Sequence, residues 1–183
     1  MIPYAHAAIG YLLWTGITHL SDGRPPGHAE VWLLLLGTQF PDIVDKPLAW
    51  TFGVLPSGRS LGHSLFTVAV VFAVLYAVGT RLGRKNLALA FGAGHLSHSL
   101  ADVYPFLFQA RYEYLGYLVW PILSGPPDAG KSFAAYLQRL SLQSFLSVQA
   151  LLAALIVAIW VADGMPGLRI PRPGDADSAH LDD

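Results

Sequence analysis

The chain has 183 residues, of which 54% are hydrophobic and 13% are charged, and its formal net charge is −1. This length and composition predict one folded domain, and the lack of a basic stripe with interleaved aromatic residues argues against a nucleic-acid partner. Because the sequence contains no cysteine, disulfides, thiolate metal sites and cysteine nucleophiles are excluded.

Long apolar runs predict helices within a membrane. Residues 61–79 contain no charged side chain when His63 is neutral, and residues 141–162 contain none at all. Both runs reach the roughly 20 residues that cross a bilayer as a helix. Shorter apolar runs cover residues 2–18, 31–40 and 86–101. We therefore predict an all-α integral membrane protein, a bundle of about five mostly antiparallel helices.

Loop signals separate the predicted helices along the chain. The second helix is predicted to stop at Pro41-Asp42, because proline disfavours a continuing helix. Residues 106–124 are rich in aromatic side chains and are predicted as an interfacial or re-entrant cap. Residues 1–165 then form a membrane-embedded domain, and residues 166–183 form a disordered polar tail. The helices are predicted at residues 4–20, 28–40, 61–82, 86–103 and 142–162.

Histidine and aspartate residues gather at one end of this arrangement. His98 and Asp102 are four residues apart, so they share a helix face, where an imidazole and a carboxylate can bind one divalent metal ion. In an up-and-down bundle, the starts and ends of alternate helices meet at the same end. The side chains expected at that end are His6, Asp42, Asp45, His63, His98 and Asp102.

This clustering favours a metal site over buried structural residues, because ionisable groups are costly within a bilayer. The structural alternative is a core histidine with a satisfied hydrogen bond beside a helix-end carboxylate. His95 either orients a metal ligand through a hydrogen bond or is simply buried. The remaining histidines, which are predicted to be structural or solvated, are His19, His28 and His180.

Four segments carry a resemblance to a known family. They are His6, Gly-Thr-Gln-Phe-Pro-Asp-Ile-Val-Asp at 37–45, Arg-Ser-Leu-Gly-His-Ser-Leu at 59–65, and Gly-His-Leu-Ser-His-Ser-Leu-Ala-Asp at 94–102. Over residues 1–105 the chain resembles the membrane-bound metal-dependent hydrolases, a group that includes LexA-regulated inner-membrane proteins. The order Asp, His, His-x-x-x-Asp is also similar to one zinc site of zinc-dependent phospholipases C and related nucleases.

The resemblance implies one zinc ion. The implied ligands are His63, His98 and Asp102 together with Asp42, for which Asp45 is the alternative. His6 would lie beside this ion or hold a second one. Here Gly58 stands where the family usually has a histidine, so the second ion is left open.

Two further residues receive catalytic roles. Whichever of Asp42 and Asp45 is not a ligand can act as the base, and we assign that role to Asp45. Arg59 is a candidate clamp for an anionic substrate, with an arginine at the membrane interface as the alternative. With His6, these are the predicted catalytic residues.

The predicted function is a zinc-dependent membrane hydrolase of phosphoesters, lipid or lipid-linked, that uses metal-activated water. The alternative is a metal-stapled structural or ion-transport membrane protein without hydrolytic activity. Arg81, Arg84 and Lys85 occupy a short loop that the positive-inside rule assigns to the cytoplasm. The protein is therefore expected to be multi-pass in the inner membrane, with the bilayer as a partner and the site at the outer face.

Residues 125–132, Gly-Pro-Pro-Asp-Ala-Gly-Lys-Ser, match the phosphate-loop pattern letter for letter. That loop works between a strand and a helix of a parallel sheet. Two prolines stiffen the segment, and no set of strands is predicted in the chain. We therefore expect no nucleotide at Gly125–Ser132.

Overall fold

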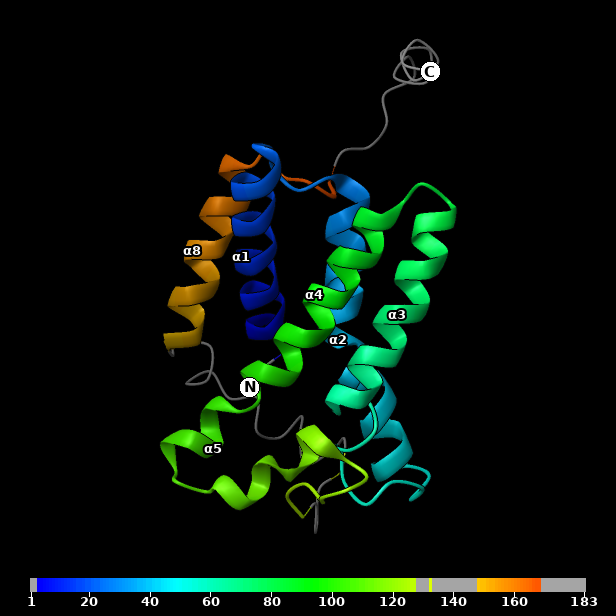
Figure 1. The fold of residues 1–183 in the computed structure, drawn as a ribbon. Helices are drawn as coiled ribbons and strands as arrows, with labels where there is room; N and C mark the ends of the chain where they lie inside the picture. Colours follow the sequence, from blue (N-terminus) through cyan, green and yellow to red (C-terminus); the bar gives the residue numbers. More distant parts are fainter. Residues whose placement is uncertain (1–2, 128–131, 133–147, 169–183) are drawn as a thin grey trace.

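The computed structural model describes residues 3–127, 132 and 148–168, and over these residues the chain is helical, with no strand. The all-α prediction is confirmed for this part of the chain. Four long helices come first, followed by a short helix, a 3-10 helix and a last helix (Figure 1). Their bounds are α1 Pro3–Asp22, α2 His28–Trp50, α3 Leu65–Arg81, α4 Lys85–Ala101, α5 Tyr104–Phe108, η1 Tyr112–Val119 and α8 Val148–Ala162.

Helix α4 lies at the centre and contacts α1, α2 and α3, while α8 packs against α1 (Figure 1). Buried apolar side chains from α1, α2, α4 and α8 form one core, which includes Tyr11, Trp14, Leu34 and Ile156. Beyond the last turn of α4, the chain continues into α5 and η1 at the lower end of Figure 1. The start of α1 and the loop that precedes α3 lie toward the same end.

Glycine allows the backbones of α2 and α4 to touch. A Cβ atom added at Gly37 would lie 2.2 Å from the carbonyl oxygen of Phe91, and one added at Gly94 would lie 2.3 Å from that of Leu34. Real side chains essentially never come so close to backbone atoms. The two helices are therefore in direct contact next to Thr38 and His98, where the candidate site lies.

The prediction that the second helix stops at Pro41 is wrong. Helix α2 continues through Pro41 and Pro47 to Trp50. A proline disfavours a continuing helix locally, but packing in the folded protein regularly outweighs such local preferences. As a result, Asp42 and Asp45 lie on the last turns of α2 rather than in a loop.

The third helix begins later than predicted, at Leu65 instead of residue 61. Ser64 caps it, since its hydroxyl oxygen accepts a hydrogen bond from the backbone N–H of Phe66 (3.3 Å). Residues 61–64 therefore belong to the preceding loop. This places His63 on a loop rather than on a helix.

No helix in the described part of the chain combines the length and the apolar character needed to cross a membrane. Of the predicted span at 141–162, residues 141–147 lie outside the described residues. The same holds for residues 128–131 of the phosphate-loop pattern and for residues 169–183 of the predicted tail.

Asp163 ties α8 to α1 at the end opposite the candidate site. Its carboxylate accepts hydrogen bonds from the hydroxyls of Tyr11 and Thr15, both at 2.7 Å, and contacts Nε2 of His19 at 2.8 Å. Burial alone would raise the pKa of Asp163, but these hydrogen bonds outweigh burial and lower it. His19, which is predicted to be structural or solvated, has a side chain that is 49% exposed and paired with Asp163.

Candidate metal centre

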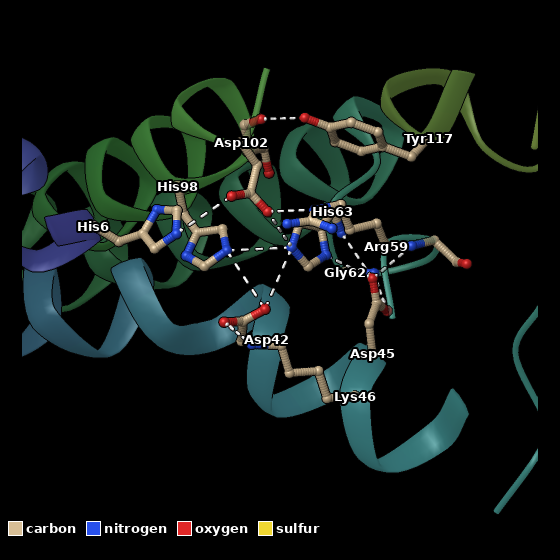
Figure 2. A network of polar contacts seen from close by, with 12 residues as sticks. His6, Asp42, Asp45, Lys46, Arg59, Gly62, His63, His98, Asp102 and Tyr117 are labelled. Carbon is tan, nitrogen blue, oxygen red and sulfur yellow. Dashed lines mark hydrogen bonds and ion pairs between the residues drawn. The ribbon is translucent and has the colours of Figure 1, made fainter. Parts of the chain in front are cut away.

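Two imidazoles and a carboxylate meet at one end of the long helices (Figure 2). Nε2 of His63 lies 3.2 Å from Nε2 of His98. Oδ1 of Asp42 lies 3.6 Å from the first of these nitrogens and 3.7 Å from the second. Ligand atoms at the corners of a zinc tetrahedron with bonds of about 2.1 Å are about 3.4 Å apart. The three atoms are therefore close enough together to hold one divalent metal ion.

The other nitrogen of each imidazole is held by an acceptor. Nδ1 of His63 donates to Oδ2 of Asp45 at 2.8 Å, and Nδ1 of His98 donates to the carbonyl oxygen of Thr38. Because a carbonyl and a carboxylate only accept, both protons sit on Nδ1 when the rings are neutral. The Nε2 lone pairs then face each other, a repulsion that a cation between them, or a proton on one of the two nitrogens, would relieve. Metal-binding histidines are generally oriented by this kind of hydrogen bond.

Asp102 lies on the other side of the same imidazoles. Its Oδ2 is 3.6 Å from Nε2 of His63, and its Oδ1 is 3.4 Å from Nε2 of His6. Nε of Arg59 donates to Oδ2 at 2.6 Å. Burial alone would raise the pKa of Asp102, but Arg59 and the hydrogen bond from His6 outweigh it and hold that pKa well below its usual value. Likewise, burial would lower the pKa of Arg59, but the Asp102 carboxylate outweighs burial and raises it.

Two groups of potential ligands share His98. One consists of Asp42, His63 and His98, and the other of His6, His98 and Asp102, with the ligand atoms of each group within 4.8 Å of one another. Since Nδ1 of His98 donates to Thr38, only its Nε2 is available for a metal. His98 can therefore serve only one of the two groups at a time.

The ring of His6 stacks on that of His98, with centroids 3.8 Å apart and an angle of 14° between the planes. Nδ1 of His6 is buried and has no hydrogen-bond partner among the described residues. A buried polar atom without a partner is costly, so this nitrogen is suited to receive a proton or bind a ligand.

The structure separates the roles of the two aspartates that the sequence left open. Asp42 is the one beside both Nε2 atoms. Asp45 is fully buried and faces the loop, where it accepts hydrogen bonds from the backbone N–H groups of Ser60 (2.8 Å), Gly62 (2.7 Å) and His63 (3.3 Å). Asp45 therefore fixes the loop that carries His63, in addition to the ring of His63 itself.

His95 holds the same loop from the opposite side. Its Nε2 donates to the carbonyl oxygen of Gly62 at 2.7 Å, and both groups are buried. His95 is thus buried, as one of its two alternatives has it, and its hydrogen bond goes to the backbone beside His63 rather than to a candidate ligand side chain.

Three charged side chains are the most exposed members of the site. Asp42, Lys46 and Arg59 are 15%, 16% and 24% exposed, whereas the side chains of His63, His98 and Asp102 are at most 3% exposed. The hydroxyl of Tyr117 in η1 donates to the backbone carbonyl of Ser99 at 2.9 Å. The accessible rim thus offers two cations around an otherwise buried cluster.

Two parts of the site escaped sequence analysis. The carbonyl of Thr38 has no side-chain signature, so no sequence pattern could have indicated it. Lys46 pairs with Oδ2 of Asp42 one turn earlier on α2. The spacing of four residues signals this pair, but only for a helix that continues past Pro41.

A family model described as YdjM inner membrane protein matches residues 1–166. No curated protein and no solved structure matches the chain. The matched region contains every helix described above and every residue of the candidate site.

Proposed function

The chain belongs to the YdjM inner membrane protein family, and we propose that it is a metal-dependent membrane hydrolase that cleaves phosphoesters. One observation carries this proposal: the Nε2 atoms of His63 and His98 face each other at 3.2 Å, with Oδ1 of Asp42 beside both. Nitrogen and oxygen donors at this spacing suit zinc. The ligands of a single ion would be Asp42, His63 and His98, with Asp102 as a further candidate.

A zinc ion bound there would polarise the ester and lower the pKa of a water molecule toward neutrality. The protein supplies orientation and proton transfer. Asp45 and the Thr38 carbonyl keep Nε2 of the two histidines directed at the ion. His6, whose ring stacks on that of His98 and whose Nδ1 has no partner among the described residues, would be the base for the attacking water.

An anionic substrate agrees with the rim of the site. Arg59 uses Nε to hold Asp102, and a guanidinium carries further N–H donors on its other nitrogens. Its side chain is 24% exposed, so these donors can reach a phosphoryl group at the opening. Arg59 then both positions Asp102 and binds the substrate.

We propose that the helices lie within the inner membrane as a multi-pass bundle, with the site at the outer face. The family supports the membrane location. Exposed valines at four-residue intervals on α3 (Val70, Val74 and Val78) support contact with lipid. Arg81 and Arg84 lie at the end of α3 away from the site, which the positive-inside rule assigns to the cytoplasm. A site in this place favours lipid or lipid-linked phosphoesters.

The test is hydrolysis of a chromogenic phosphodiester and a chromogenic phosphomonoester by purified protein, before and after chelation. We expect turnover by wild type, its loss on chelation, and its recovery when Zn²⁺ is added. His98→Ala should show no turnover. His19→Ala is the matched control, since this histidine lies at the opposite end. Metal binding without turnover of any ester would favour a structural staple, and turnover that is insensitive to chelator would exclude a metal-dependent hydrolase.

A further inference from the structure

Lys46 places a positive charge next to a proposed metal ligand. It lies one helical turn after Asp42 on α2, and its ammonium pairs with Oδ2 of that aspartate. Both side chains are mostly buried, and Nζ of Lys46 also lies 5.6 Å from the centroid of the Trp50 ring. A cation at this place repels a metal ion. Its presence beside Asp42 therefore calls for a role that offsets this cost.

The two oxygens of Asp42 face different partners. Oδ2 is engaged by Lys46, whereas Oδ1 lies 3.6 and 3.7 Å from Nε2 of His63 and His98. A carboxylate can bind a metal ion through one oxygen or through both. The ammonium of Lys46 occupies the oxygen that would complete the second mode.

We propose that Lys46 is a positioning residue that restricts Asp42 to binding the metal ion through Oδ1 alone. This inference rests on the proposed metal centre. One-oxygen binding leaves a coordination position for water or substrate, and catalytic zinc sites differ from structural ones by having such an open position. Lys46 thereby keeps the site catalytic rather than structural.

The position of Lys46 on α2 fixes its ammonium next to Oδ2 of Asp42. Residues four apart on a helix are neighbours, so the pair forms without any other element having to move. Trp50, another four residues on, lies under the ammonium and limits its freedom. Trp50, Lys46 and Asp42 thus follow one another along one face of α2, with the ammonium of Lys46 between the Trp50 ring and Oδ2 of Asp42.

The test compares wild type with Lys46→Met and Lys46→Arg. Zn²⁺ affinity is measured by calorimetry, and the number of oxygen and nitrogen neighbours of bound zinc by X-ray absorption. For Lys46→Met we expect Zn²⁺ affinity equal to or greater than that of wild type, one additional oxygen neighbour, and kcat for phosphoester hydrolysis lower by about tenfold or more with little change in KM. Lys46→Arg should restore the wild-type neighbour count, and Lys85→Met at the opposite end is the matched control.

The outcomes separate this inference from the proposed function. Wild type that binds no Zn²⁺ would overturn both. Wild type that binds Zn²⁺, with Lys46→Met showing an unchanged neighbour count, would overturn the role of Lys46 alone. A KM increase without a change in kcat would instead make Lys46 a substrate-binding residue. Lys46→Gln, which keeps a polar side chain, replaces Lys46→Met if the methionine variant does not fold.

Discussion

Substitution of Gly94 by alanine tests whether the contact between α2 and α4 builds the metal centre. The new Cβ would lie 2.3 Å from the carbonyl oxygen of Leu34 and 2.9 Å from the backbone nitrogen of Thr38. Both are backbone atoms of α2 and cannot rotate away. To reach an ordinary contact of 3.4 Å, the two helices must part by about 1 Å.

This separation acts directly on the ligands. His98 lies one turn beyond Gly94 on α4, while Asp42 and the Thr38 carbonyl belong to α2. Metal sites tolerate errors of about 0.2 Å in ligand distance, and a displacement of about 1 Å in a catalytic constellation can cost about a hundredfold in rate. We therefore expect Gly94→Ala to weaken Zn²⁺ binding by at least about tenfold, a typical effect of disturbing the groups that orient metal ligands.

The assay is calorimetric titration of the folded variant with Zn²⁺, alongside circular dichroism to establish that the helices remain. Gly16→Ala on α1 is the matched control, because an added Cβ there meets nothing within 4 Å. It should bind Zn²⁺ as wild type does. Equal affinity in wild type and Gly94→Ala would refute the reasoning that close helix contact sets the ligand geometry.

Two further predictions concern single carboxylates. Asp45→Asn should weaken Zn²⁺ binding by about 10- to 100-fold and lower the free energy of unfolding by about 1–3 kcal/mol, because an amide cannot accept all the loop hydrogen bonds that the carboxylate accepts. Calorimetry measures the change in Zn²⁺ affinity, and denaturant unfolding measures the change in stability. Asp22→Asn is the control for both. Asp163→Asn should lower Tm at neutral pH. The pKa of Asp163 is lower in the folded state than in the unfolded state, so the Asp163 carboxylate stabilises the fold above its unfolded pKa of about 3.9, and this stabilisation is lost as the pH falls through the folded pKa. The difference in Tm between wild type and Asp163→Asn should therefore shrink in acid. A difference that grows in acid would contradict this assignment.

Long apolar runs and loop signals were sufficient to predict the all-α class and which ends of the helices meet. The side chains of His6, His63, His98 and Asp102 come together because alternate helix ends coincide, and this follows from the order of the apolar runs alone. Helix bounds were less predictable. Pro41 looks like a stop in sequence, but α2 continues past it to Trp50 under the influence of tertiary packing.

The choice between Asp42 and Asp45 required the fold. Both follow Pro41 in the sequence, and both can bind a metal ion. Only the position of the loop before α3 shows that Asp45 bonds Nδ1 of His63 while Asp42 lies beside its Nε2. Contacts between residues far apart in the chain, such as the Thr38 carbonyl with His98, leave no trace in local sequence patterns.

In the proposed metal centre, His63 and His98 bind one divalent metal ion together. Elemental analysis of purified protein after equilibration with Zn²⁺ and removal of unbound metal tests it most directly. We predict one zinc ion per chain for wild type and for His19→Ala, and a loss of bound zinc in both His63→Ala and His98→Ala. Wild-type zinc content in the last two variants would contradict the account.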